Sequence, residues 1–128
     1  LTYWYKVVGI DYDGNETLLD KAAAISTFSF TRKLPGAPVI NSINKTAEPC
    51  AVILNWSPGY DPATQVGFIV YRSSAAAGPF IPVVVSPVAG NSYTDTNVVR
   101  GQAYWYTTAV LMKNGRLSPM SAAKSITP

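Results

Sequence analysis

Apolar and polar residues alternate in short runs along residues 35–128, and Gly, Pro, Asn or Asp separate the runs. A period of two places successive side chains on opposite faces of a β-strand. The pattern predicts seven strands, namely Val39–Asn44, Ala51–Trp56, Val66–Ser73, Phe80–Val85, Asn91–Asp95, Gln102–Leu111 and Ser118–Ile126. Because no helical period lies between them, we expect an all-β sandwich of two antiparallel sheets.

The same alternation assigns the two faces of the central strands. The side chains predicted to point inward are Trp56, Phe68, Val70, Tyr104 and Tyr106. Those predicted to point outward, on two neighbouring strands, are Ile69, Tyr71, Trp105 and Thr107. An outward aromatic stripe can stack on a sugar ring or contact a partner protein, which makes Ile69, Tyr71 and Trp105 the candidate ligand-binding residues. The alternative is that a neighbouring domain or long side chains cover the stripe.

Tyr93–Tyr106 organises the rest of the pattern. It reads as a strand end, a polar turn, an apolar corner, Gly101 and then a strand with aromatics at alternate positions. This order is typical of the corner where the chain crosses between the sheets of a β-sandwich. We therefore expect Tyr104 to fill the gap between the sheets with its ring and to hydrogen-bond upstream backbone with its hydroxyl.

The first 34 residues form a separate pattern. Leu1–Ile10 is strongly β-prone, Asp11–Glu16 predicts a turn through Asp-Gly and Gly-Asn, and Thr17–Thr27 predicts a returning strand. Residues 28–34 read as a linker. The stiff sequence Pro-Gly-Ala-Pro at 35–38 then predicts a domain boundary.

This first segment repeats the end of the chain. Tyr3-Trp4-Tyr5 aligns with Tyr104-Trp105-Tyr106, and without a gap Gly14 meets Gly115 and Thr17 meets Ser118. Self-similarity over about one domain length indicates tandem domains.

The composition excludes several classes of function. Hydrophobic residues make up 48% of the 128 residues and charged ones 13%, so the chain can bury a core. There is no His and one Cys, which excludes a His/Cys metal site, a Cys/His pair and a Ser/His/Asp triad. The net charge of +3 is spread without a basic cluster, and no apolar run reaches the length of a membrane span. We therefore expect no enzyme activity, cofactor, metal, nucleic-acid partner or membrane span.

Two features keep two readings each, and a third, Asp95, keeps one. Cys50 is either a small buried apolar residue or a thiol open to intermolecular pairing. Asp11–Glu16 is either a hairpin turn with solvated acids or, less in keeping with its spacing, a fragment of a calcium loop. Asp95 falls at the corner, where carboxylates usually cap turns, and no carboxylate pair accompanies it for catalysis.

Taken together, these features resemble the fibronectin type III family. The resemblance is carried by Trp56, Gly67–Arg72, Tyr93–Val98, Gly101–Tyr106 and Asn114-Gly115 followed by Ser118. It covers nearly all of Pro35–Pro128 and implies an immunoglobulin-like, seven-stranded antiparallel β-sandwich. Residues 35–128 then form one complete domain, and residues 1–27 are the last two strands, F and G, of a preceding one. Two departures are the lack of Arg-Gly-Asp near the last turn and Thr108 at a position that is usually apolar.

The resemblance implies a non-catalytic spacer or interaction module of a secreted or cell-surface multidomain protein. Two alternatives are a carbohydrate-binding accessory module that uses Ile69, Tyr71 and Trp105, and a strand-exchanging subunit of an extracellular fibre or surface assembly. The expected partners are neighbouring domains of the same polypeptide, or other copies that pair through Leu1–Thr27, with polysaccharide as a further candidate.

Overall fold

The computed structural model describes residues 8–10, 12–14, 16–18, 36–59 and 64–128. The chain divides into two units, Leu1–Leu34 and Pro35–Pro128, which are described separately. Every named element in both units is a β-strand, as the alternating pattern predicts.

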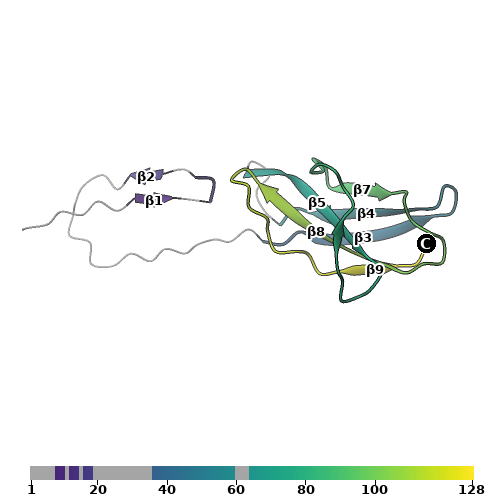
Figure 1. Cartoon of the computed structure of the whole chain (residues 1–128). Helices are drawn as coiled ribbons and strands as arrows, with labels where there is room; N and C mark the ends of the chain where they lie inside the picture. Colours follow the sequence, from purple (N-terminus) through teal and green to yellow (C-terminus); the bar gives the residue numbers. More distant parts are fainter. Residues whose placement is uncertain (1–7, 11, 15, 19–35, 60–63) are drawn as a thin grey trace, which may run out of the picture. The chain divides into compact units, whose positions relative to one another are not determined.

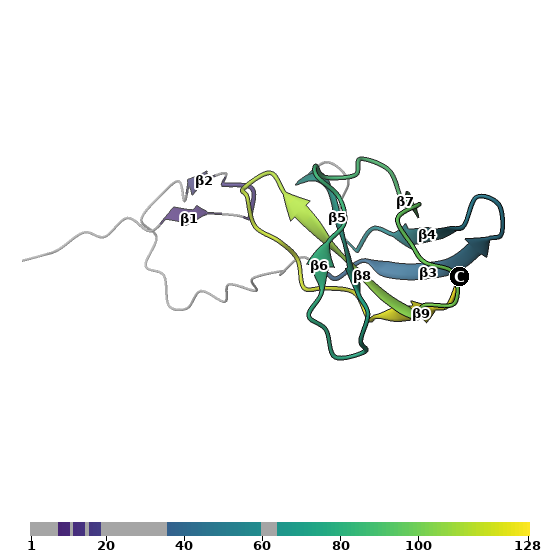
Figure 2. The same cartoon turned by 45° about the vertical axis from the view of Figure 1, so that its right-hand side comes forward.

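The second unit is a sandwich of two antiparallel sheets (Figures 1 and 2). The three-stranded sheet has the order β3-β4-β7, and the four-stranded sheet has the order β6-β5-β8-β9. The strands are β3 (Val39–Thr46), β4 (Ala51–Ser57), β5 (Gln65–Ser73), β6 (Ile81–Pro82), β7 (Ser92–Asp95), β8 (Tyr104–Met112) and β9 (Lys124–Ile126). The prediction of seven strands in two antiparallel sheets is therefore confirmed.

Strands β5 and β8 form the longest pairing, from Gln65↔Met112 to Ser73↔Trp105, with one register shift beside Gly67. Gly67 lies where another segment crosses. A Cβ on it would stand 2.8 Å from both the Pro87 Cβ and the Val88 carbonyl oxygen. Its missing side chain lets Phe68 and Val88 exchange two backbone hydrogen bonds of 2.8 Å each.

Two predicted strands are shorter than the pattern suggests. The run Phe80–Val85 pairs only at Ile81–Pro82, because Pro82 has no N–H for the ladder, and β6 lies at the sheet edge as a proline requires. The return from Ser118 is regular only in β9. Before β9, the N–H groups of Val110 and Thr108 donate to the hydroxyl oxygens of Ser118 and Ser121, at 2.9 and 3.0 Å. Serine side chains thus replace backbone carbonyls where Pro119 interrupts the strand.

The core lies between the two sheets. Its buried members are Ile40, Val52, Leu54, Trp56, Phe68, Val70, Tyr104, Tyr106, Val110 and Met112. The rings of Trp56 and Phe68 are tilted, with centroids 5.3 Å apart. All of the side chains predicted to point inward are buried, so that prediction is confirmed. Thr108, which the resemblance marked as a departure, is fully buried in the described structure, and its hydroxyl has no hydrogen-bond partner there.

The first unit contains an antiparallel hairpin of β1 (Val8–Ile10) and β2 (Glu16–Leu18), joined by a turn at residues 12–14. The pairs are Val8↔Leu18, Gly9↔Thr17 and Ile10↔Glu16, and Gly14 has a φ of +82°. This is the hairpin that the sequence predicts around Asp-Gly. Leu1–Val7, the end of the predicted returning strand and the predicted linker lie outside the described residues.

We predict that Trp56→Ala lowers the free energy of unfolding by about 3–5 kcal/mol, because the ring fills the middle of the core and is 2% exposed. Val39→Ala is the control, since Val39 is 59% exposed on β3 and its truncation should cost no more than about 0.5 kcal/mol. Urea unfolding followed by circular dichroism measures both. Equal midpoints for the two variants would remove Trp56 from the core.

Candidate functional site

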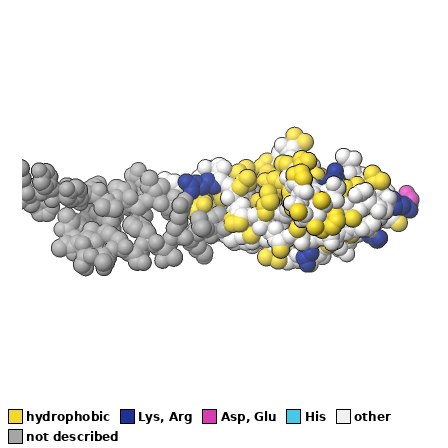
Figure 3. Space-filling view, turned by 60° about the horizontal axis from the view of Figure 1, so that its bottom comes forward, with side chains coloured by type: hydrophobic (Ala, Val, Ile, Leu, Met, Phe, Trp, Pro, Cys, Tyr) yellow, Lys and Arg dark blue, Asp and Glu magenta, His cyan; other side chains and the backbone are white. Residues whose placement is uncertain are grey.

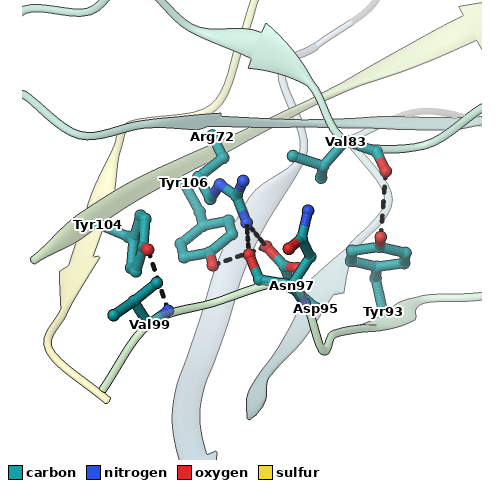
Figure 4. Close-up of polar contacts among 8 residues, drawn as sticks. All are labelled: Arg72, Val83, Tyr93, Asp95, Asn97, Val99, Tyr104 and Tyr106. Atoms are coloured by element: carbon teal, nitrogen blue, oxygen red, sulfur yellow. Dashed lines mark hydrogen bonds and ion pairs between the residues drawn. The ribbon is translucent and has the colours of Figure 1, made fainter. Parts of the chain in front are cut away.

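A small polar pocket opens between the edge strands of the two sheets. Its volume is about 280 Å³, and its lining residues are Arg72, Pro82, Val83, Tyr93, Asp95, Thr96 and Asn97. Arg72 comes from β5, Pro82 from β6, and Tyr93 and Asp95 from β7, so both sheets contribute. Figure 4 shows the polar contacts around it.

Strand alternation explains why a charged residue lies here. Arg72 follows Phe68 and Val70 at inward positions of β5, so its side chain leaves the strand toward the interior and reaches the corner where the core ends. Asp95 is the last residue of β7 and is 2% exposed. The Arg72 Nη1 and the Asp95 Oδ2 lie 2.6 Å apart and form an ion pair.

Both oxygens of the Asp95 carboxylate accept hydrogen bonds. Its Oδ2 accepts the Arg72 Nη1–H and, at 2.9 Å, the hydroxyl of Tyr106. Its Oδ1 accepts the backbone N–H of Asn97 at 2.9 Å, which is the turn-capping role predicted for it. A buried carboxylate needs such donors to offset its lost hydration. Asp95 therefore holds the corner together and is not available as a general base.

The same contacts fix the ionisation of their partners. Burial lowers the pKa of the Arg72 guanidinium, but the charge of Asp95 and the hydrogen bond to it outweigh this, and the pKa is raised overall. Burial, followed by the charge of Asp95, raises the pKa of the Tyr106 hydroxyl well above its ordinary value. At neutral pH, Arg72 is thus charged and Tyr106 is protonated and donates its hydrogen bond.

Arg72 is held on two further sides. Its Nη1 also donates to the carbonyl of Asn97 at 2.6 Å, and its guanidinium lies 5.0 Å from the centroid of the Tyr104 ring. Tyr104 is 8% exposed, and its hydroxyl accepts the N–H of Val99 at 3.0 Å (Figure 4). The prediction of a corner tyrosine that fills the gap and bonds upstream backbone is confirmed.

The structure places the sequence-predicted stripe on the other side of the same sheet. Ile69 pairs with Ala109, Tyr71 with Thr107, and Trp105 with Ser73, so the three residues share one face. Tyr71 is only 8% exposed and Thr107 only 2%, whereas Ile69 and Trp105 are half-buried. Burial also raises the pKa of the Tyr71 hydroxyl. Ile69 and Trp105 therefore supply most of the accessible surface of the stripe, and its sugar binding stays a prediction.

Sequence reasoning identified Tyr104 and Asp95 but missed the ion pair between Asp95 and Arg72. The alternation of apolar and polar residues places Arg72 at an inward position, and a charged residue there requires a buried partner of opposite charge. Which acid supplies that partner depends on the crossing of two strands from different sheets, which no local pattern encodes.

We predict that Asp95→Asn lowers the free energy of unfolding by about 2–4 kcal/mol, since it leaves the largely buried Arg72 without its counter-charge. Glu48→Gln is the matched control, because Glu48 also pairs with an arginine, Arg100, at 2.9 Å but on the open surface. That pair should contribute at most about 1 kcal/mol. Chemical unfolding measures the free energy of unfolding of both variants. Equal losses of that free energy would contradict the bridging role of Asp95.

Sequence comparison finds relatives among polysaccharide-degrading enzymes, although no family model matches the chain. It is 39% identical over 72 residues, 56% of its length, to an amylopullulanase of Thermoanaerobacter thermohydrosulfuricus. It is 30% identical over 129 aligned positions, 98% of its length, to exoglucanase B of Cellulomonas fimi. These matches span only 5% and 11% of the two enzymes, so the chain corresponds to a small part of each.

Solved structures agree with this fold. A fibronectin type III-like protein from Clostridium thermocellum superposes with a TM-score of 0.63 and 25% identity, over 75% of this chain and 96% of that one. Module A71 of titin from human cardiac muscle gives a TM-score of 0.55 at 24% identity, over 73% of this chain and 88% of the module. By its strand order, its corner tyrosine and its likeness to these structures, the second unit has the fold of a fibronectin type III domain.

Proposed function

We propose that the chain is a non-catalytic spacer and interaction module of a secreted, multidomain, carbohydrate-active protein. The observation that carries this proposal is the match to exoglucanase B, which runs along 98% of the chain yet spans only 11% of that enzyme. We interpret a segment that matches so small a part of a much longer enzyme as an accessory part of that enzyme. In the part of the chain that the structure describes, no helix is long and apolar enough to cross a membrane.

The geometry of the second unit suits a spacer. Gly36, where the described chain enters, contacts the β4–β5 loop, since a Cβ on it would lie 2.8 Å from the Gly59 oxygen. The chain leaves beside the opposite corner, where the N–H of Gly101 donates to the carbonyl of Pro128 at 2.6 Å. The pairing of Val52 with Asp95 and of Asn55 with Ser92 places the corner at the far pole of the sandwich from the β4–β5 loop. Gly36 and Pro128 thus lie at opposite poles of the sandwich, an arrangement that suits units joined in a line.

The surface also suits contact with other domains. Figure 3 shows hydrophobic side chains gathered over the side of the second unit that faces the viewer. Large apolar side chains exposed on the described residues are Val39, Val66, Ile81, Val85, Val99, Leu117 and Met120. A neighbouring domain could cover some of these side chains, which is the contact that this proposal expects. The candidate sugar contact through Trp105 remains a second proposal, supported by its half-buried ring on the same face of the sheet as Tyr71 and Ile69.

Asp95 also supports the proposal that the module is non-catalytic. It is the buried acid of the second unit, and three donors already occupy it. Among the described residues, no three His, Cys, Asp or Glu side chains come together.

We predict that replacing residues 35–128 by a flexible Gly/Ser linker in the parent protein leaves hydrolysis of soluble oligosaccharides unchanged and slows hydrolysis of an insoluble polysaccharide. A rigid spacer holds domains at a set distance, which a flexible chain cannot do. The control replaces the same residues with the related fibronectin type III-like domain from Clostridium thermocellum, which should keep both rates. Equal rates on the insoluble substrate for all three proteins would refute the spacer role, and release of sugar by the isolated chain would refute its non-catalytic nature.

We further propose that residues 1–27 are the F–G hairpin of a second domain of the same family. One residue pairing of each hairpin corresponds without a gap: Ile10 pairs with Glu16 as Leu111 pairs with Leu117, each pair 101 residues from its counterpart. Both turns carry a glycine of positive φ, +82° at Gly14 and +80° at Gly115. The match to exoglucanase B continues through this region, as expected for a tandem array.

A two-stranded hairpin alone is only marginally stable in water. In residues 1–128, we therefore expect the amides of Val8–Ile10 to exchange with deuterium much faster than those of β8, and the chain to be a monomer by light scattering. Lengthening the chain with the residues that precede it in its parent should slow this exchange. A dimer with protected β1 amides would favour strand exchange between copies, and a monomer with β1 as protected as β8 would contradict both arrangements.

A further inference from the structure

Several polar groups in the pocket of Arg72 have no protein partner. Nη1 of Arg72 makes both of the side chain's hydrogen bonds, to Asp95 and to the carbonyl of Asn97. Within residues 36–59 and 64–128, no hydrogen bond engages its Nε or Nη2, the Thr96 hydroxyl or the Asn97 side-chain amide. A guanidinium carries five N–H donors, so donors on Nε and Nη2 remain besides these two bonds, and the Arg72 side chain is 21% exposed.

Arg72 and Tyr93 are held in place before any ligand arrives. The ion pair, the Asn97 carbonyl and the Tyr104 ring hold the guanidinium on three sides. The hydroxyl of Tyr93 donates to the carbonyl of Val83 at 3.1 Å, which fixes the Tyr93 ring at the pocket wall. Figure 4 shows the Asn97 side chain pointing up between Arg72 and Tyr93. Groups that are already immobile lose little entropy on binding.

The charge and the walls of the pocket select a class of ligand. Arg72 and Asp95 cancel, and the remaining lining residues are neutral, so the pocket has no net charge for an anion or a cation. Tyr93, Pro82 and Val83 provide an apolar wall, whereas Arg72, Thr96 and Asn97 offer donors and acceptors opposite it. A volume of about 280 Å³ is at the lower end of ligand pockets, which start at about 300 Å³, and suits one ring rather than a chain.

We propose that this pocket binds a single pyranose unit of a neutral oligosaccharide. The free edge of Arg72 and the Asn97 amide hydrogen-bond adjacent hydroxyls of the sugar, and the ring contacts Tyr93 and Pro82. The choice of sugar rests on the proposed role in a carbohydrate-active protein, whereas the position rests on the pocket alone. It gives the module a contact with polysaccharide that is separate from the stripe of Ile69, Tyr71 and Trp105.

The test is a titration of ¹⁵N-labelled chain 1–128, monitored by amide NMR, with a neutral β-1,4-linked glucose tetramer, an α-1,4-linked glucose tetramer and tetragalacturonic acid. We expect saturable shifts centred on residues 93–97 and on Arg72 with a neutral tetramer. Asn97→Ala should weaken binding about 3- to 10-fold, as the loss of one hydrogen bond does, without changing stability because the Asn97 side chain bonds to nothing in the described structure. Asn44→Ala, an exposed asparagine on β3, is the matched control and should bind as the parent chain does.

Arg72→Lys serves as a second variant, since it keeps the charge beside Asp95 but removes the planar fork. It should weaken binding more than Asn97→Ala does, and its unfolding curve shows whether the domain remains folded. The proposal is overturned if no tetramer gives a saturable shift. It is also overturned if the Asn97→Ala and Asn44→Ala variants bind with equal affinity. Shifts at Trp105 alone also overturn it and favour the stripe, and binding of tetragalacturonic acid alone overturns the choice of a neutral ligand. None of these outcomes affects the linker-replacement experiment, so the spacer role stands or falls separately.

Discussion

The buried carboxylate of Asp95 is the constraint on which the corner of this sandwich depends. An ionised group removed from water costs several kcal/mol unless donors replace its hydration. Its donors come from three places in the fold, Arg72 on β5, Tyr106 on β8 and the backbone of Asn97 in the corner. Asp95 itself belongs to the three-stranded sheet, while β5 and β8 belong to the four-stranded one. This cluster therefore joins the two layers by polar contacts at the pole where the apolar core ends.

The same cluster determines what this pole of the domain can do. By holding Arg72 on one nitrogen, it leaves the rest of the guanidinium facing the pocket between β6 and β7. Further along the corner, the hydroxyl of Tyr104 accepts the N–H of Val99 and fixes the backbone there. Gly101 then anchors the end of the chain through Pro128. These hydrogen bonds thus order both the candidate ligand pocket and the position of Pro128.

The edges of the second unit limit how it can pair with other chains. On the four-stranded sheet the outer strands are short: β6 has two residues and contains Pro82, and β9 has three. Between Ser118 and Ser121 the hydroxyl groups take the place of backbone acceptors, so this stretch does not present a continuous strand. Short and interrupted edges disfavour edge-to-edge association. Pairing between copies through the four-stranded sheet is therefore disfavoured.

The sequence alone determined the class of fold, the positions of the strands and most of the core. These follow from local physics: alternation selects strands, Gly and Pro select turns, and an inward Trp56 or Tyr104 must be buried. The hairpin around Gly115, the corner role of Tyr104 and the capping role of Asp95 were predictable for the same reason. The internal repeat was also visible, because Gly14 and Gly115 occupy the same place in two runs of similar residues.

Only the tertiary structure decided which residues from different strands meet. Arg72 and Asp95 are 23 residues apart and on different sheets, so their pairing depends on how the layers cross. The burial of Tyr71 and Thr107 on a face that alternation marks as outward likewise depends on the packing of neighbouring side chains. The length of the last strand depended on whether Ser118 and Ser121 would use their hydroxyls or their carbonyls, a choice between two acceptors of similar strength. Local patterns determine which way a side chain points, and the three-dimensional arrangement determines what it meets there.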